Sequence, residues 1–499
     1  MSRATPSTPP TPPARSGDLP QIIQGGMGVA VSDWGLARAV SLTGQLGVVS
    51  GTALDVLCTR RLQHGDPGGH VRRALAAFPV PEVAQWILDA YFVEGGIAPD
   101  ALYRQVPRHT IESGRRTVQL TTAANFVEVF LAKEGHDGVV GVNYLRKIEL
   151  PLPSALYGAM LAGVDYVLVG AGSPAEIPEL TRTLARHAPV AFSIKVQGAR
   201  SSDGLGDVRF DPAQVHPDAA TTLAPLALPR VLAIVASTDL ATALAENEGT
   251  RPAGFVVEGP SAGGHNAPPR GPRQLDPIGQ PVYDDRDVVD LPTLAALGLP
   301  FWLAGSYGSP QRFREALAAG AAGIQVGTIF AYSDDSGFDP ELVAMVRARV
   351  LAGDLQVRAD WRASPTGFPF RVVELPGTLT DEAVHAARQP VCDLGALRSA
   401  FRREDGGVDY RCPAEPLRAY TRKGGREANT EGRVCLCNAL FASAGLGQRR
   451  PGGVIEPPLV TSGEDLSGVA ALLTAARGGT VESGEFGYTA RDVVDYLLS

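Results

Sequence analysis

Long apolar runs and clusters of basic residues are both missing from this sequence of 499 residues. No uninterrupted apolar stretch approaches the roughly 20 residues that cross a bilayer, and the first residues do not form the charged, then apolar, start of a secretion signal. We therefore predict no membrane partner and a cytoplasmic location. The net charge is −8 and no lysine or arginine run occurs. Nucleic acid is not expected as a partner, because its binding needs clustered cations.

Cysteine is also scarce, and an odd number of five does not make a disulfide framework in a large chain. Four of the five lie in the last third of the sequence: Cys392, Cys412, Cys435 and Cys437. Four thiols can bind zinc or an iron–sulfur cluster. However, the last two are separated by one residue instead of the usual two to four, and the other two are distant in the sequence. Buried cysteines are the commoner case, and we predict no metal site.

Apolar residues, at 44%, and 57 glycines are abundant, so the chain can bury a large core. Residues 1–18 are rich in proline, serine and threonine, which predicts a disordered lead. In residues 19–333, short apolar runs alternate with amphipathic stretches, which indicates strands and helices around a parallel sheet. In residues 334–499 this alternation fades into helical patterns and loops. We expect a mainly helical extension packed on the first part.

More than eight segments have the character of strands. The expected strands are Ile22 to Gly25, Leu46 to Ser50, Val118 to Thr121, Val139 to Tyr144, Tyr166 to Gly170, Ala191 to Val196, Val231 to Ala236, Phe255 to Glu258, Phe301 to Ala304 and Ile324 to Gly327. Repeated strand and helix units over about 310 residues fit a TIM (β/α)₈ barrel with insertions. A dinucleotide-binding Rossmann sheet is less suitable, because the first turn, Gln24 to Gly28, lacks the G-x-G-x-x-G spacing.

The stretch GFVVEGPSAGGHNAPPRG, from Gly254 to Gly271, combines the features of a reaction centre. A buried strand opens into a loop in which small residues let the backbone approach a flat ligand. His265 in this loop is the side chain that titrates near neutral pH. Barrel enzymes place catalytic residues at the carboxyl ends of strands and hold phosphate in the loops after the last two strands. Glycine-rich loops follow the last two expected strands here, and a helix beginning at Ser309 follows the first of these loops, which predicts a phosphate site.

Five motifs in this order, IIQGGMGVAVS, GVVGVNYL, VVEGPSAGGHN, FWLAGSYGS and GIQVGTIF, resemble the nitronate monooxygenase family, formerly called 2-nitropropane dioxygenases. These are FMN-dependent barrel enzymes related to the FMN-containing enoyl-acyl-carrier reductases. The segments FVEVFLAKEGHDG, LYGAMLAGVDYVLVGAG, ASPTGFPF and VCLCNALFASAGLGQ resemble a long-chain branch that includes reductases of polyunsaturated fatty acid synthases. The resemblance covers most of the chain from Leu19 onward.

The resemblance implies FMN as cofactor and assigns the active-site histidine to His265. It places the flavin contacts at Gly25, Gly26, Met27, Asn143, Glu258, Ala262 and Gly264. It implies that the phosphate is held by Gly305, Ser306, Gly327 and Thr328, and that Lys195 lies near the flavin ring. The chain departs from the family pattern in a longer loop from Asn266 to Arg270, and in the segment Ala304 to Tyr307. The longer loop reshapes the substrate side of the expected site.

Two oxidoreductase functions fit His265. A neutral imidazole can act as a base near an acidic carbon, in the oxidation of a nitronate or nitroalkane by O₂. In an enoyl-acyl (carrier protein) reductase that uses NAD(P)H, the same residue would donate a proton, and acyl carrier protein would be a partner. We favour oxidation of a small molecule, because the sequence contains no distinct NAD(P)H site. A non-catalytic flavin-binding protein is a third interpretation, and a homo-oligomer is compatible with the sequence.

A different enzyme class arises from Gly259 to Gly263, which formally reads G-x-S-x-G. This is the nucleophile elbow of α/β-hydrolases, with Ser261 as nucleophile. The elbow requires a helix directly after the serine. Two glycines and a proline pair follow Ser261 instead, and these residues do not readily start a helix. The hydrolase is therefore only a remote alternative.

Overall fold

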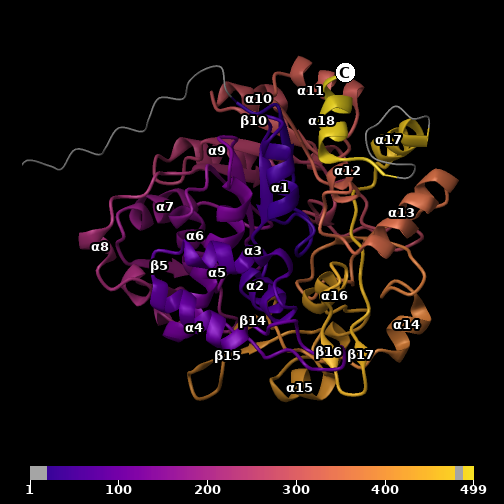
Figure 1. Cartoon of the computed structure of the whole chain (residues 1–499). Helices are drawn as coiled ribbons and strands as arrows, with labels where there is room; N and C mark the ends of the chain where they lie inside the picture. The colour runs from indigo at the N-terminus through magenta and orange to yellow at the C-terminus, as the bar shows by residue number, and fades with distance from the viewer. Residues whose placement is uncertain (1–18, 478–486) are drawn as a thin grey trace, which may run out of the picture.

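Eight short parallel strands form a closed barrel in the computed structural model, which describes residues 19–477 and 487–499 (Figure 1). The predicted disordered lead lies outside the described residues. The strands are β1 (Ile22–Gln24), β2 (Gly47–Ser50), β3 (Val140–Leu145), β4 (Tyr166–Gly170), β7 (Arg230–Val235), β8 (Gly254–Glu258), β10 (Phe301–Ala304) and β11 (Gly323–Val326). They are ordered β1-β11-β10-β8-β7-β4-β3-β2.

The two ends of this sheet meet, because the Gln24 amide donates to the Leu46 carbonyl (2.9 Å) and the Leu46 amide donates to the Ile22 carbonyl (3.1 Å). The predicted TIM barrel is therefore confirmed. Side chains from alternate strand positions fill the barrel, including Ile23, Val48 and Trp302.

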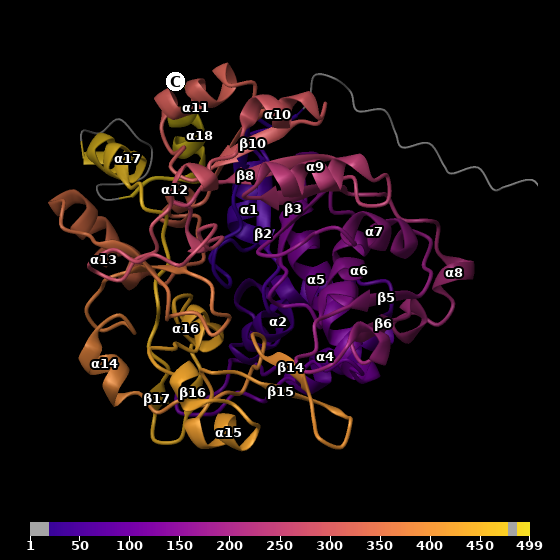
Figure 2. The same cartoon turned by 180° about the vertical axis from the view of Figure 1, so that it is seen from behind.

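Helices surround the barrel strands (Figures 1 and 2). They are α1 (Trp34–Ser41), α2 (Leu54–Gln63), α3 (His70–Ala76), α4 (Pro81–Tyr91), α5 (Arg115–Lys133), α6 (Leu152–Leu161), α7 (Ile177–Ala185), α8 (Ala219–Thr222), α9 (Thr238–Glu246), α10 (Leu291–Ala296), α11 (Pro310–Ala318) and α12 (Thr328–Ala331). The Ser309 side chain caps α11 by accepting from the Arg312 amide (3.3 Å), and Gly320 follows the helix with a φ of 85°. The cap agrees with the helix that the sequence predicts to begin at Ser309, and a positive φ is typical of a glycine that ends a helix. Within the described ranges, no helix has the length and apolar character of a bilayer span.

Two expected strands are not barrel strands. Val118 to Thr121 belongs to helix α5, which is buried along most of its 19 residues. A helix buried on nearly all sides loses its amphipathic period, so its sequence is easily taken for a buried strand. The segment from Ala191 contributes to β5 (Val190–Ser193), which pairs antiparallel with β6 (Asp207–Phe210) in a separate sheet. β5 exposes two of its four residues, whereas parallel barrel strands are buried on both faces.

The extension after residue 333 contains helices and also short strands. The helices are α13 (Pro340–Ala352), α14 (Glu382–Ala387), α15 (Leu417–Arg422), α16 (Leu436–Ala442), α17 (Ser467–Arg477) and α18 (Ala490–Leu498). The strands are β12 (Val357–Asp360), β13 (Phe370–Val373), β14 (Ser399–Arg402), β15 (Val408–Arg411), β16 (Arg449–Arg450) and β17 (Val454–Ile455). Figure 2 shows α13 and α14 on the side opposite α7 and α8, while α18 packs against α1 and α11. The extension also reaches the barrel loops, because β13 pairs with β9 (Gly264–His265).

Candidate active site

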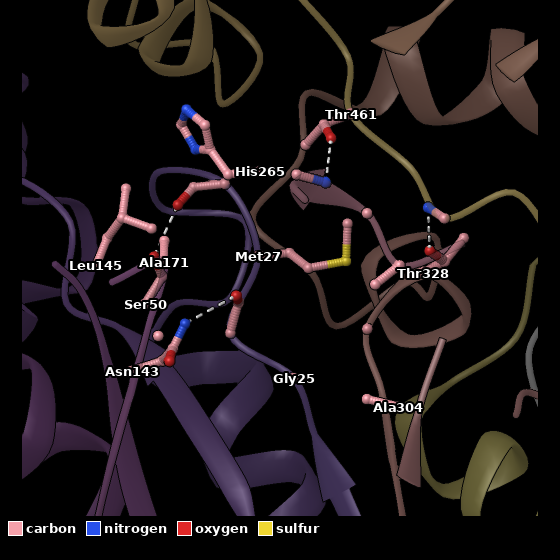
Figure 3. A pocket seen from close by; sticks show the side chains of 18 of the residues that line it. Gly25, Met27, Ser50, Asn143, Leu145, Ala171, His265, Ala304, Thr328 and Thr461 are labelled. Atoms are coloured by element: carbon pink, nitrogen blue, oxygen red, sulfur yellow. Dashed lines mark hydrogen bonds between the residues drawn. The ribbon is translucent and has the colours of Figure 1, made fainter. Parts of the chain in front are cut away.

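A cavity of about 220 Å³ lies at the carboxyl ends of the barrel strands and is bordered on one side by the extension. Figure 3 shows how several of its side chains converge from different strands. Nearly all predicted site residues line this cavity: Gly25, Gly26, Met27, Asn143, Glu258, Ala262, Gly264, His265, Gly305, Ser306, Gly327 and Thr328. Local sequence motifs separated by up to 300 residues are thus brought to one place by the barrel topology.

The glycines on one wall are required by close packing. A Cβ atom on Gly26 would lie 2.8 Å from Cβ of Asn143, and one on Gly327 would lie 2.5 Å from Sδ of Met27. Real Cβ atoms do not approach other heavy atoms this closely. Ser306 has a φ of 59°, which is unusual for a residue other than glycine. Such conformations cluster at ligand-binding sites, and this one lies in the predicted phosphate loop.

Two carboxamide oxygens on this wall have no hydrogen-bond partner. They are Oδ1 of Asn143 and Oε1 of Gln325, and both side chains line the cavity. An unpaired buried acceptor is destabilising by about 1–3 kcal/mol. A ligand with N–H or O–H donors would relieve this cost, so the donor set of the cavity fits a polar aromatic cofactor. Gln325 lies in the GIQVGTIF motif but was not identified from the sequence as a site residue.

His265 is held in place by the extension. It pairs with Phe370, and Gly264 pairs with Arg371, in the small sheet of β9 and β13. The hydroxyl of Thr461 accepts from the Gly264 amide (3.0 Å) and donates to the Arg371 carbonyl (2.7 Å). Figure 3 shows the first of these bonds. The position of the histidine therefore depends on segments about 100 and 200 residues further along the chain.

The imidazole of His265 is neutral at physiological pH. Burial, and then the charge of Lys147, lower its pKa to about 3. Nε2 of the ring lies 2.7 Å from Oγ of Ser364, and the ring meets Phe370 edge-on at 4.9 Å between centroids. Ser364 belongs to the ASPTGFPF segment, so that segment contacts the predicted catalytic residue directly. Ser364 was not identified from the sequence as a site residue.

The cation near the histidine is Lys147 and not Lys195. Lys147 follows β3, and its ammonium lies 3.2 Å from the centroid of the Phe368 ring. Burial lowers the pKa of Lys147 to about 8. Lys195 follows β5, outside the barrel sheet; its side chain is exposed and does not line the cavity. The implied contact between Lys195 and a flavin ring is therefore not supported by its position. The implied contact assumes that β5 is a barrel strand, whereas β5 pairs with β6 in a separate sheet.

The hydrolase interpretation is also not supported by the local structure. Ser261 is followed by strand β9, whereas a nucleophile elbow is followed by a helix. The Ser261 hydroxyl accepts a hydrogen bond from the Ser306 hydroxyl (2.8 Å), and the imidazole of His265 contacts Ser364 instead.

The cysteines of the extension are closer together than their sequence spacing indicates. Cys412, Cys435 and Cys437 belong to one apolar cluster, and Cys437 also lines the cavity. Burial raises the pKa of Cys435 to about 12 and that of Cys437 well above its usual value. Protonated thiols are poor metal ligands and poor nucleophiles. In the described ranges, no group of three or more cysteine, histidine or acidic side chains is arranged to hold a metal ion.

Glu258 should make the stability of the protein pH-dependent. Burial raises the pKa of its carboxyl from 4.5 to about 8. Between these pH values the unfolded chain releases this proton and the folded chain keeps it, so folding becomes less favourable as pH rises. Each pH unit in this interval lowers the free energy of unfolding by about 1.4 kcal/mol. Because the carboxyl borders a cavity open to solvent, we expect about half of the full effect, roughly 2 kcal/mol at pH 8.

The Glu258→Gln variant removes this titration. In urea unfolding of the ligand-free protein, we expect the free energy of unfolding of Glu258→Gln to exceed that of the parent by about 2 kcal/mol at pH 8 and to equal it near pH 4. The exposed Glu246 provides the control, since Glu246→Gln should not change the pH dependence. A stability difference between Glu258→Gln and the parent that is the same at both pH values would contradict a buried, protonated carboxyl.

Comparison with known proteins gives similarity to solved structures only. No protein-family model and no curated protein matches the sequence. The chain is similar to FabK from Thermotoga maritima, with 14% identity, coverage of 96% of this chain and 91% of that chain, and a TM-score of 0.42. It is similar to nitroalkane oxidase from Streptomyces ansochromogenes, with 14% identity, coverage of 96% and 94%, and a TM-score of 0.44.

A further similarity is to the enoyl reductase domain of MlnA, from the macrolactin biosynthesis cluster of Bacillus amyloliquefaciens. The identity is 12%, the coverage is 72% of this chain and 64% of that chain, and the TM-score is 0.37.

Proposed function

We propose that this protein is an FMN-dependent oxidoreductase of the nitronate monooxygenase family that oxidises a nitronate with O₂. The observation that carries the proposal is the convergence of the predicted motifs around one cavity that contains a half-buried, neutral histidine. FMN, when bound, would supply the electron acceptor. Co-substrate, carrier-protein partner, oligomeric state and cytoplasmic location all stay predictions.

The residues of the cavity would contact two parts of FMN, its ring and its phosphate. Gly25, Gly26 and Met27 form the first loop, which would lie against the ring together with Ala262 and Gly264. Asn143 and Gln325 bring unpaired acceptors, which suit the N–H and hydroxyl donors of this cofactor. Gly305, Ser306, Gly327 and Thr328 form the two loops that would hold the phosphate.

The electrostatics favour a preformed nitronate over a neutral nitroalkane. An imidazole whose pKa is about 3 is a weak base for removing a proton from carbon. A nitronate has already lost this proton. The negative charge of the nitronate would interact favourably with the ammonium of Lys147. It would thereby offset the effect of that ammonium on His265 and raise the pKa of the imidazole. His265 would then orient the anion through a ring nitrogen. If the Ser364 hydroxyl donates to Nε2, Nδ1 carries the proton of the neutral ring and can donate to the anion.

Ser364 should act as a positioning residue for His265. Without its hydroxyl the ring loses the 2.7 Å contact that fixes its orientation. We expect Ser364→Ala to lower kcat with a nitronate about 10- to 100-fold and to leave KM nearly unchanged. Thr366→Val is the matched control: it removes the bond between Thr366 and Ser364 but not the one to the ring, so kcat should fall less than about threefold. Equal losses in both variants would argue against a specific role for Ser364.

Enoyl reduction remains the second candidate because apolar side chains of the extension line the cavity. Leu436, Leu440 and Phe441 offer more apolar surface than a small nitronate needs. In that reaction His265 would give a proton to the substrate carbanion after hydride transfer.

The two functions are separated by a pair of measurements on the purified protein. The nitronate reaction predicts bound FMN, O₂ uptake with alkyl nitronates in the absence of NAD(P)H, and slower uptake with the corresponding nitroalkanes. Enoyl reduction predicts stoichiometric reduction of the flavin by NADPH under anaerobic conditions. A protein that neither contains nor takes up FMN would exclude both.

A further inference from the structure

We propose that the first turn of α17, in the C-terminal extension, binds the phosphate of FMN through the backbone amides of Gly468 and Val469. The two loops after β10 and β11 would then be joined by a third phosphate-binding element, which lies outside the sequence motifs. This inference rests on the proposed function, because that function requires FMN. It gives the extension a direct part in recognition of the cofactor.

Helix α17 begins at the wall of the cavity. The extension contributes five residues to the cavity lining, namely Thr461, Gly463, Asp465, Gly468 and Val469, and the last two belong to the first turn of α17. Figures 1 and 2 show α17 beside α12, the helix that follows β11. The first amides of a helix have no partner within the helix. Those of α17 are therefore available to a ligand in the cavity.

The first turn of α17 lies against both predicted phosphate loops. A Cβ atom on Gly468 would lie 2.1 Å from the carbonyl oxygen of Gly308, in the loop after β10, and 2.8 Å from Cδ1 of Ile329, after β11. Glycine therefore permits this close approach of the backbone. The Gly463 amide donates to Oγ1 of Thr328 (2.7 Å), a bond that Figure 3 shows. The extension and the two loops thus form one continuous wall.

Two buried amides of this turn have no acceptor. Hydrogen bonding within α17 starts with the Ala470 amide, which donates to the Leu466 carbonyl (2.9 Å). Leu466 precedes the helix and has no side-chain acceptor to offer. Within the part of the chain that the structure describes, the amides of Gly468 and Val469 donate to no oxygen, although both residues are buried. Buried amides without a partner are rare and destabilising, so these two indicate an acceptor on a ligand.

The expected acceptor is an anion that is bound without a cationic side chain. No lysine or arginine is among the described residues that line the cavity. The charge of a phosphate would therefore be balanced by backbone amides and by the positive end of α17, which has 11 residues. Asp465 also lines the cavity, and its Oδ1 accepts from the Ser467 amide (2.9 Å). Its negative charge would weaken phosphate binding, so removal of this charge should strengthen it.

The experiment compares FMN with riboflavin, which has the same ring and no phosphate. Full-length protein freed of flavin is titrated with each, and the quenching of flavin fluorescence gives the dissociation constant. Val469→Pro removes one N–H, and proline is tolerated in the first turn of a helix. We expect this variant to bind FMN about 10- to 100-fold more weakly than the parent does, because a hydrogen bond to a charged group is lost. Its affinity for riboflavin should change less than about threefold.

Two further variants separate the phosphate contact from packing. Val469→Ala is the matched control, since it keeps the N–H and removes part of the buried side chain. It should change the affinities for FMN and riboflavin by the same factor. Asp465→Asn keeps an acceptor for the Ser467 amide and removes the charge. Its affinity for FMN should rise roughly 3- to 10-fold, with riboflavin binding unchanged.

Equal affinity of the parent for FMN and riboflavin would overturn the proposal, as would a folded Val469→Pro that loses affinity for both flavins equally or for neither. If Val469→Pro does not fold, unchanged FMN affinity in Asp465→Asn overturns it, because the phosphate then lies elsewhere. The proposed function fails separately. A protein with the expected FMN profile that oxidises no nitronate keeps the phosphate contact and loses the nitronate reaction, whereas a protein that binds neither flavin loses both.

Discussion

His265→Ala is expected to lower turnover of a nitronate by a factor of about 10², because the ring orients the anion, while leaving the FMN content unchanged. The imidazole is a titratable side chain that the barrel and the extension jointly hold at the cavity. Alanine removes the ring but keeps the backbone pairing of this position with Phe370. The loops proposed to bind FMN do not depend on the ring, so the loss should appear in turnover and not in cofactor binding.

Steady-state O₂ uptake and the flavin spectrum of the same preparation measure both quantities. His385→Ala is the control, because His385 lies on α14 in the extension and does not line the cavity. Added imidazole should restore part of the activity of His265→Ala if the ring acts chemically. Full activity of His265→Ala on every substrate of the parent would show that the catalytic residue lies elsewhere.

Gly263→Val is expected to lower both stability and FMN content, because it separates the barrel from the extension. A Cβ atom at Gly263 would lie 2.9 Å from the amide nitrogen of Gly463 and 2.9 Å from the carbonyl carbon of Ser462. Both contacts are with backbone, which cannot rotate away. Overpacking of this kind is destabilising by about 1–3 kcal/mol, and valine should reach the upper end of that range.

The effect on FMN follows from the contacts that join the two parts. The Glu464 amide donates to the Ser261 carbonyl (3.0 Å), and the Gly463 amide donates to Oγ1 of Thr328 (2.7 Å) in the proposed phosphate loop. A shift of this segment displaces the loop. Urea unfolding and the ratio of flavin to protein absorbance test the prediction. At Gly114, with φ of −65° and nothing within 4 Å of an added Cβ, alanine should change stability by less than about 0.5 kcal/mol. Equal stability and equal flavin content in Gly263→Val and the parent would contradict the predicted effect of Gly263→Val.

The extension is thus part of the site and not an accessory to it. It supplies Thr461, which bonds to the Gly264 amide, Ser364, which contacts the imidazole, and the apolar residues of α16. The sequence pattern changes at residue 333, and the division of the chain at this residue reflects that change alone. It does not describe a boundary of the cavity.

The sequence by itself determined the features that depend on neighbours in the chain. Alternating apolar runs and helical stretches predicted the barrel, because periodicity and turn residues act over a few positions. The strand ends then identified the lining loops, since parallel strands of a barrel present their carboxyl ends on one face. His265 and the glycine loops were found in this way. Local sequence does not reveal the structure where burial removes the amphipathic period, as in α5, or where a strand lies outside the barrel, as in β5.

Only the tertiary structure decided which distant residues meet at the site. Lys147, and not Lys195, lies near the histidine; Ser364 contacts its ring; and Gln325 brings an unpaired acceptor to the cavity. The thiols of Cys412 and Cys437 also come together across 25 positions of sequence. These contacts depend on the simultaneous packing of many elements, and no local pattern of residues encodes them. The local sequence therefore specified the chemistry of the loop around His265, and the packing of the extension specified its orientation and surroundings.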